Sequence, residues 1–198
     1  MELKQAALVI VDIVGYTQFI QFNQTSLLHA EAIISELLET VIDKAEYPLT
    51  LNKLEGDAAL LYADLTEADI TAAARDILNQ VDAFFNAFHA RIRLMVSGAA
   101  CPCDACQHIG DLKLKAILNK GEVAFKTVRQ FQELAGLEVI WVHRLLKNTV
   151  PADEYILATE AYAAALGDLP DRRCDEHHEQ YPDLGSARLR VYYPAVVA

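Results

Sequence analysis

The chain has 198 residues, 53% of them hydrophobic and 23% charged, which is too apolar for a disordered protein and long enough for one ordinary domain, expected to span 1–198. Its 28 Asp and Glu residues outnumber its 17 Lys and Arg residues, and the formal net charge of −11 argues against a general nucleic-acid binder. Because no apolar run is long enough to cross a bilayer and no cleavage-site pattern occurs at the N-terminus, we expect a cytoplasmic protein without membrane spans.

The first half of the chain alternates strand-like and helix-like patterns. An almost wholly apolar run, ALVIVDI, is typical of a central strand that is covered on both faces. Apolar residues at spacings of three and four then predict a long amphipathic helix that ends before Tyr47-Pro48. We expect a strand at 6–12, a helix at 26–45, hairpin strands at 49–53 and 58–63, and a helix that is capped at 66–69 and ends near residue 90.

The second half predicts shorter elements. Leu and Lys alternate before Asn119-Lys120-Gly121, where we expect a turn. We expect a strand at 112–118, one short helix within 122–139, a helix at 139–146, a strand at 155–158, a helix at 159–166 capped by Thr159, a surface loop at 172–185 and an edge strand at 188–193. The order β-α-β-β-α-β predicts an α+β fold, the ferredoxin-like split βαβ plan with C-terminal αβ additions.

Two carboxylates lie at the ends of predicted strands. Asp12 follows a wholly apolar run, where a buried charge is costly unless something compensates it, and Asp57 lies in the turn of the hairpin. Each has an ordinary interpretation, since Asp12 can cap the next helix and turns favour Gly-Asp. In a split βαβ sheet, however, the two positions are neighbours, and paired carboxylates repel unless a divalent cation such as Mg²⁺ or Mn²⁺ lies between them. The pair therefore predicts a metal site of the kind used in phosphoryl transfer.

The motifs around these carboxylates resemble those of a known family. DIVGYT at 12–17 and KLEGDA at 53–58 look like the two metal-binding motifs of the class III nucleotidyl cyclases, the adenylate and guanylate cyclases. GEV and GLEVIWVHRL further along resemble two more motifs of that family, so the resemblance runs from about residue 6 to 160. A closer likeness, through HAEAIISELL, the CxCxxC cluster and HRLLKN, is to a group of bacterial cyclase-like domains of unknown function. The resemblance implies a ferredoxin-like sheet of the nucleotide cyclase type.

The resemblance assigns roles to individual residues. In the family, two Asp carboxylates and the carbonyl that follows the first hold two metal ions, and Asp12, Ile13 and Asp57 occupy these positions. Purine choice in the family comes from a Lys and an Asp. Lys53 matches the Lys and favours ATP, while Glu133 falls near the Asp position. The implied reaction is attack of the ribose 3′-hydroxyl on the α-phosphorus of ATP with Mg²⁺ or Mn²⁺ as cofactor, giving cyclic AMP and pyrophosphate.

The match is weaker at the residues that stabilise the transition state. Arg144 falls on the catalytic Arg of the family, although an Arg on a helix face is often simply solvated. Ile140 replaces the usual Asn one turn earlier, and the C-terminal Lys of the family has no clear counterpart. Loss of one such donor costs about 100-fold or more in rate. The other cations that we consider as substitutes are Lys115, Lys126, Lys147 and His143.

Two functions therefore compete. The first is an adenylate cyclase, and the second is a catalytically degenerate cyclase-fold protein that binds nucleotide and metal as a sensor or interaction module. A different phosphoryl-transfer enzyme on the same sheet is a third, weaker reading. Because the family builds each site from two protomers, the resemblance implies a homodimer with shared active sites. Trp141 is a candidate for the interface, and a place in the core explains it equally well.

The cysteines form a separate cluster. Without a signal peptide, four cysteines indicate a reducing compartment, and Cys101, Cys103 and Cys106 lie close together in sequence. At CxCxxC spacing their thiolates can reach one Zn²⁺, and a redox role or no special role are the alternatives. The candidates for a fourth zinc ligand are His108, Cys174, His177 and His178.

Overall fold

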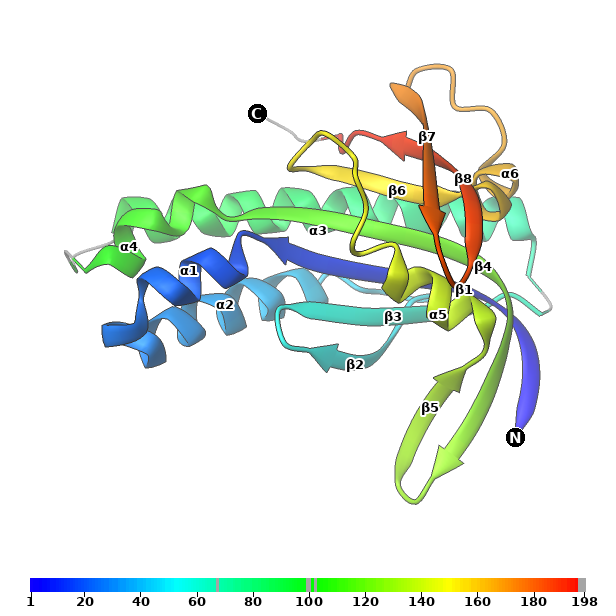
Figure 1. Cartoon of the computed structure of the whole chain (residues 1–198), viewed down its shortest axis with the longest axis horizontal. Coiled ribbons are helices and arrows are strands. Elements are labelled where there is room, and N and C mark those ends of the chain that lie inside the picture. The colour runs from blue at the N-terminus through cyan, green and yellow to red at the C-terminus, as the bar shows by residue number, and fades with distance from the viewer. Residues whose placement is uncertain (67, 99–100, 102, 196–198) are drawn as a thin grey trace.

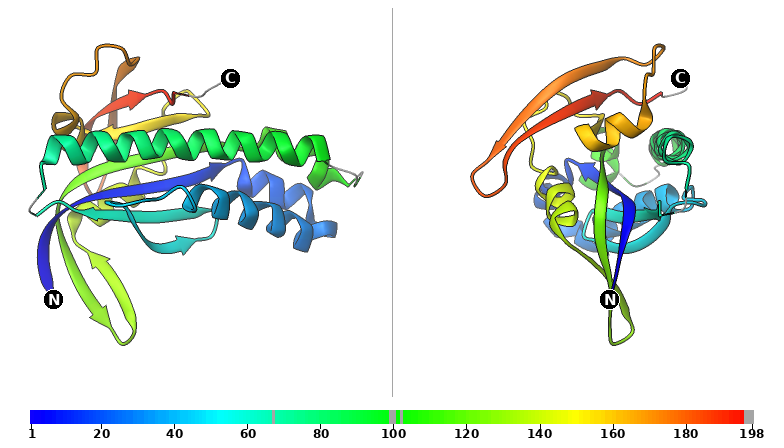
Figure 2. Two further views of the ribbon diagram at one scale, coloured as in Figure 1. Left: turned by 180° about the vertical axis from the view of Figure 1, so that it is seen from behind. Right: turned by 90° about the vertical axis from the view of Figure 1, so that its right-hand side faces the viewer.

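The computed structural model describes residues 1–66, 68–98, 101 and 103–195. In this part of the chain the strands form an eight-stranded sheet in the order β2-β3-β1-β4-β6-β8-β7, and β5 pairs with β4 outside that row. Helices cover both faces of the sheet (Figures 1 and 2). This architecture confirms the α+β class, with the split βαβ core at β1 to β4 and the expected αβ additions after it.

Most of the expected elements form, with bounds that the structure extends or trims. The strands are β1 (Glu2–Val14), β2 (Thr50–Glu55), β3 (Ala58–Asp64), β4 (Lys113–Val128), β5 (Phe131–Ala135), β6 (Tyr155–Thr159), β7 (Cys174–Tyr181) and β8 (Gly185–Tyr192). The helices are α1 (Tyr16–Phe22), α2 (Leu27–Ile42), α3 (Ile70–Gly98), α4 (Asp104–His108), α5 (Leu137–Arg144) and α6 (Glu160–Leu166), with 3-10 helices at Gln24–Ser26 and Ile109–Asp111. None of the described helices combines the length and apolar content that a membrane span needs.

The strand β1 lies at the centre of the fold, between β3 and β4. Its residues Ala6–Val11 are fully buried, because successive side chains of a strand point to opposite faces and both faces are covered here. Val9 and Val11 pack with α2 and α3 on one face, whereas Leu8 and Ile10 pack with α5 on the other. Figure 2 shows these helices on opposite sides of the sheet. A continuous apolar run is therefore what this strand requires.

The helix face formed by α2, α3 and α6 holds the larger of the two cores. Three Phe residues at helical spacing on α3, at positions 84, 85 and 88, are fully buried in it. Tyr162 of α6 is also buried, and its hydroxyl donates a 3.1 Å hydrogen bond to the Ala74 carbonyl of α3. The expected cap of α6 is confirmed, since the Thr159 hydroxyl oxygen accepts from the Tyr162 amide at 3.3 Å.

The C-terminal part of the chain is tied to α3 by one ion pair. Arg172 donates to both carboxylate oxygens of Asp82 at 2.6 and 2.7 Å, and both side chains are only 15% exposed. Asp82 also accepts the amide of Ala195 at 3.0 Å. A bidentate pair with so little water around it is a strong and directional contact.

The expected turn at Asn119-Lys120-Gly121 is wrong, because β4 runs through it without a break. Asn119 is buried and its amide donates to the carbonyl and the carboxylate of Glu138 on α5, at 3.1 and 2.7 Å. Gly121 allows that helix to approach, since a Cβ there would lie 2.7 Å from Glu138. The chain reverses instead after Val128, where β5 pairs back on β4 in the hairpin at the bottom of Figure 1, so the expected helix within 122–139 is also wrong.

The C-terminal strands differ from expectation as well. Residues 174–181 form β7 within the expected loop 172–185, and β8 lies between β6 and β7, so the edge of the sheet is β7 and not β8. Most β7 side chains face solvent, and of its residues Glu179 and Tyr181 are the buried ones. An edge strand that is mostly exposed to solvent needs few apolar residues, which is why its sequence resembles that of a loop.

Candidate functional site

The two predicted metal ligands lie at one end of the central strands. Asp12 lies two residues before the end of β1 and pairs with Ala58 of β3, and Asp57 lies in the turn between β2 and β3. The Ile13 amide donates a 3.1 Å hydrogen bond to the Asp57 carbonyl, which fixes that turn against the end of β1. The structure therefore brings Asp12, Ile13 and Asp57 together, as the split βαβ topology predicts.

The two carboxylates have different electrostatic surroundings. Lys115 lies opposite Asp12 on β4, with its ammonium nitrogen 3.0 Å from Asp12 Oδ2 and both side chains 16% exposed. The same ammonium donates to the Leu146 carbonyl at 3.0 Å. Burial, and next the charge of Asp12, raise the pKa of Asp57 to about 6, although Lys115 opposes this. Two acids and one base leave one excess negative charge, and oxygen donors of this kind suit Mg²⁺ or Mn²⁺.

The backbone turns sharply just after Asp12. Gly15 has a φ of +94°, a left-handed conformation that other residues rarely adopt, and α1 begins at the next residue. The hydroxyl of Tyr16 donates to Glu31 of α2 at 2.9 Å, and this bond, with burial, raises the pKa of Tyr16. The glycine thus lets the chain leave the sheet directly into a helix beside the carboxylates.

The two predicted purine-selecting residues are in contact. Lys53 of β2 lies with its ammonium nitrogen 3.5 Å from Glu133 of β5 and 3.4 Å from Glu55. The other oxygen of Glu55 lies 2.8 Å from His143 Nε2, while Nδ1 of that ring donates to the Val139 carbonyl at 2.7 Å. The result is a row of paired side chains, Glu133, Lys53, Glu55 and His143, that runs from the β4–β5 hairpin to α5.

The predicted transition-state residue lies near the other end of this row. Arg144 at the end of α5 forms an ion pair with Asp183, which lies in the turn between β7 and β8. Ile140, one turn earlier, is 52% exposed, and its neighbour on the helix, Leu137, is 56% exposed. Trp141 is partly buried instead and packs against the core between α5 and the sheet, edge-on to Tyr181 with ring centres 6.0 Å apart.

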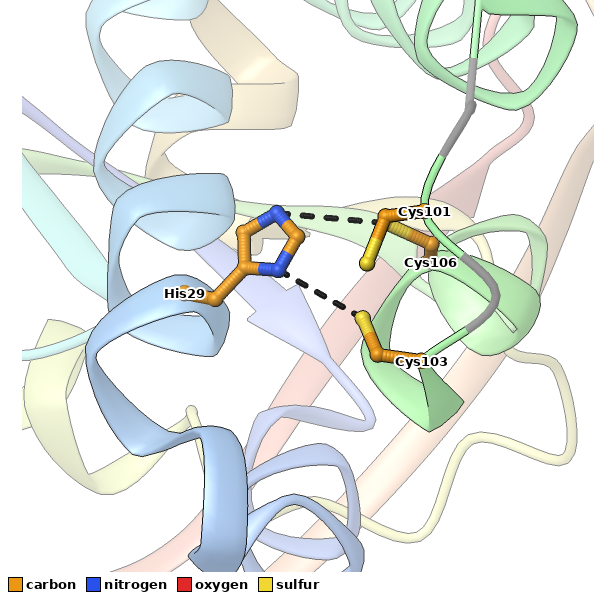
Figure 3. A group of neighbouring side chains, drawn as sticks. All are labelled: His29, Cys101, Cys103 and Cys106. Carbon is orange, nitrogen blue, oxygen red and sulfur yellow. Dashed lines mark hydrogen bonds between the residues drawn. The ribbon is translucent and has the colours of Figure 1, made fainter.

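The cysteine cluster includes a histidine that the sequence did not suggest as a ligand. Cys101, Cys103 and Cys106 lie together on one side of the His29 ring, in the first turn of α2 (Figure 3). His108, a candidate for the fourth ligand, lies 2.8 Å from Asp111 instead. Hydrogen bonds, first from the Cys106 backbone and then from the Cys101 side chain, lower the pKa of the Cys103 thiol to about 7. The other residues considered, Cys174, His177 and His178, lie on β7. His29 begins the HAEAIISELL motif, but that motif does not indicate a metal ligand, because the residue lies 74 positions from Cys103.

Comparison with known families gives a match that covers more than half of the chain. A family model described as "Protein of unknown function (DUF2652)" matches residues 34–155, which include Lys53, Asp57 and Arg144 but not Asp12. The "Uncharacterized protein Rv2561/Rv2562" of Mycobacterium tuberculosis is 36% identical over 133 residues. That alignment covers 67% of this chain and 60% of the mycobacterial protein.

Solved structures with the same fold are cyclase catalytic domains. The adenylyl cyclase CyaB from P. aeruginosa superposes with a TM-score of 0.69 at 16% identity, covering 100% of this chain and 96% of that one. The catalytic core of a rhodopsin-guanylyl cyclase with converted specificity, in complex with ATPαS, gives 0.70 at 16% identity over 98% and 99% of the two chains. The guanylate cyclase domain of RhGC from Catenaria anguillulae, in complex with GTP, gives 0.69 at 15% identity over 98% and 99%.

Proposed function

Because the chain belongs to the family described as "Protein of unknown function (DUF2652)" and has the fold of class III cyclase catalytic domains, we propose that it is a divalent-metal-dependent nucleotidyl cyclase. The proposed substrate is ATP and the products are cyclic AMP and pyrophosphate. The observation that carries the proposal is the meeting of Asp12 and Asp57, which the Ile13 amide fixes through its 3.1 Å bond to the Asp57 carbonyl.

The carboxylates provide a suitable site for a divalent cation. Asp12, Asp57 and the Ile13 carbonyl offer oxygen ligands, and the raised pKa of Asp57 marks a place where further positive charge is favourable. When bound there, Mg²⁺ or Mn²⁺ would neutralise the triphosphate and ease ionisation of the ribose 3′-hydroxyl. Lys115 holds the Asp12 carboxylate in position through its 3.0 Å contact and contributes positive charge of its own.

The row of charges at β2 and β5 is a suitable reader of a purine. Lys53 can donate a hydrogen bond to a ring nitrogen, and Glu133 can accept one from an exocyclic amino group. Adenine offers both on its Watson–Crick edge. Their 3.5 Å contact holds the two side chains together before any base is bound. We therefore favour ATP over GTP as substrate.

A homodimer supplies the missing half of the site in this proposal. Arg144 lies on α5, whose Leu137 and Ile140 side chains are more than half exposed, as expected of a helix that packs on a second protomer. In such a dimer, Arg144 of one protomer would stabilise negative charge on the phosphate bound at the carboxylates of the other.

A second function is favoured by what surrounds Arg144. Its ion pair with Asp183 offsets the charge that a phosphate would need, and Ile140 offers no hydrogen-bond donor where cyclases of this class have Asn. These two features suit a protein that binds metal and nucleotide without turnover, as a sensor or interaction module.

One assay separates the two functions. Purified protein is incubated with ATP or GTP and Mn²⁺, and cyclic nucleotide is measured by mass spectrometry alongside nucleotide binding. The cyclase proposal requires a cyclic product that falls about 100-fold or more in Asp57→Asn, as expected when a ligand of the metal is lost. The matched control is Asp168→Asn, which changes an exposed carboxylate between α6 and β7. Binding without product in the unaltered protein selects the second function.

The dimer has its own test. Asp57→Asn and Arg144→Ala damage the two halves of the proposed shared site, so each variant alone should be inactive. Mixed and refolded together, they form heterodimers with one intact site and should regain activity. If the mixture stays as inactive as either variant while sedimentation shows dimers, each site lies within one protomer.

A further inference from the structure

We propose that His29, Cys101, Cys103 and Cys106 form a structural zinc site that joins the start of α2 to α4 and to the two cysteines that precede α4. The site is separate from the carboxylates Asp12 and Asp57, and it does not depend on the proposed cyclase activity. It differs from the sequence-based hypothesis in its fourth ligand, which is His29 and not His108.

The geometry of the four side chains suits a tetrahedral metal. One ligand atom from each residue lies within 4.8 Å of all the others. Cys103 Sγ is 3.4 Å from His29 Nδ1, and Cys106 Sγ is 3.8 Å from His29 Nε2. Zinc bonds of about 2.3 Å to sulfur and 2.0–2.1 Å to nitrogen give tetrahedral edges of about 3.5–3.8 Å. The side chains therefore need only small movements to share one ion, and Figure 3 shows them converging on a common centre.

The donor types select the metal. Three thiolates and one imidazole are the Cys₃His set of structural zinc sites, whereas Mg²⁺ and Ca²⁺ take oxygen ligands. Four protein ligands would also fill the tetrahedron and leave no position for water or substrate, which is the mark of a structural site. His29 and Cys101 are exposed, so an ion can enter from solvent.

The neighbouring structure shows what such a site would stabilise. Helix α4 has five residues and packs on α1, the helix that starts just after Asp12 and Gly15. Helices this short have little stability of their own. A zinc ion would fix α4 to α2 and thereby support α1 at the same end of the molecule (Figure 1). We expect zinc removal to loosen α1 and α4 while β6 and β8 stay protected.

The decisive experiment measures zinc in protein that has been purified under reducing conditions. We expect one zinc per chain by elemental analysis, with an X-ray absorption spectrum of three sulfur ligands and one nitrogen. Cys103→Ser and His29→Ala should each weaken zinc binding by more than about 100-fold, since even outer-shell partners account for about 10–100-fold. The matched controls are Cys174→Ser on β7 and His108→Ala at the end of α4. They remove a cysteine and a histidine outside the proposed site, so both variants should still bind zinc.

Folding defects are separated from loss of a ligand by His29→Cys, which replaces imidazole by a fourth thiolate and should bind zinc again. Hydrogen exchange of the protein with and without chelator reports whether peptides of α1 and α4 are the ones that lose protection. Protein that stays metal-free in excess zinc overturns the proposal, as does a disulfide among the three cysteines under reducing conditions. Zinc lost in His108→Ala but kept in His29→Ala would overturn the assignment of His29.

Discussion

The ammonium group of Lys115 lies 3.0 Å from Asp12, so one carboxylate of the acidic pair already has a cation while the other has a pKa raised to about 6. The pair is therefore electrostatically asymmetric before any metal binds. Asp57 is the carboxylate whose ionisation is costly, and its titration controls both the stability of the protein and the proposed binding of a cation.

Replacement of Asp57 by Asn should stabilise the metal-free protein at high pH. A carboxyl whose pKa is raised from 3.8 to about 6 on folding binds its proton more tightly in the folded state. Stability therefore falls as the pH rises from about 4 to above 6, and Asn removes this loss. We expect Asp57→Asn to melt a few degrees higher than the parent at pH 8, because about 1 kcal/mol shifts the Tm by about 2–4 °C at this chain length. Equal melting temperatures are expected near pH 4, and identical profiles at both pH values would contradict the assignment.

Magnesium should stabilise the protein in a pH-dependent way. An ion present at about 100 times its Kd for the folded state adds about 2.7 kcal/mol to the free energy of unfolding. Below about pH 6 the ion must also displace the proton of Asp57, which weakens its binding. We expect the Tm to rise with Mg²⁺ at pH 8 but not at pH 5, in melts recorded without nucleotide. Mg²⁺ is the better probe here because thiolates bind it poorly. An equal rise in Asp57→Asn would place the ion elsewhere.

Loss of the ion pair between Arg144 and Asp183 should strengthen the binding of ATP phosphates to Arg144. Asp183→Asn removes the charge paired with Arg144 while keeping the size of the side chain. Both side chains are about half exposed, so we expect a change in unfolding free energy of no more than about 1 kcal/mol. Affinity for ATP should rise by up to about fivefold, measured by titration calorimetry with Mg²⁺. Glu176→Gln is the control, because it breaks the exposed pair with Arg190 on the same hairpin and should leave ATP affinity unchanged.

The close approach of α5 to β4 should make Gly121 intolerant of a side chain. Gly121→Ala places a Cβ 2.7 Å from Glu138, which must move and give up its 2.7 Å bond to Asn119. We expect a loss of about 1–3 kcal/mol in urea denaturation, from crowding and a weakened buried hydrogen bond. In a double-mutant cycle, Gly121→Ala should cost much less unfolding free energy in the Glu138→Ala background than in the parent protein, since the obstructing side chain is gone. Strict additivity of the two changes would mean that no such contact exists.

Patterns that report burial or family motifs predicted much of the molecule. The apolar run that ends at Asp12 specifies a strand covered on both faces, and the hairpin with Asp57 follows from its turn residues. The family resemblance alone assigned Lys53 and Glu133 to one site; they are in contact, although β5, which carries Glu133, was not expected. The strand and the hairpin can be predicted from the sequence because each depends on residues that are adjacent in the chain or on a topology with few alternatives.

Other features depend on tertiary contacts that no local pattern encodes. The motif that begins at His29 indicates a family likeness and not a ligand, and only the fold brings the cysteines close to this residue. Asn119 and Gly121 have the composition of a turn, yet both pair with β1 within the continuous strand β4, and Asn119 also bonds to Glu138. The edge strand β7 is polar on both faces, so its sequence carries no alternation.

The ion pair between Asp82 and Arg172 joins residues that the ribosome makes at different times. Asp82 is made 90 residues before Arg172, so the long helix α3 emerges from the ribosome with an uncompensated charge at the place where the C-terminal segment will dock. The amide of Ala195, which also bonds to Asp82, arrives later still. The surroundings that Asp82 has in the folded protein are therefore complete only after residue 195 has been made, and until then helix α3 carries this carboxylate without its partners.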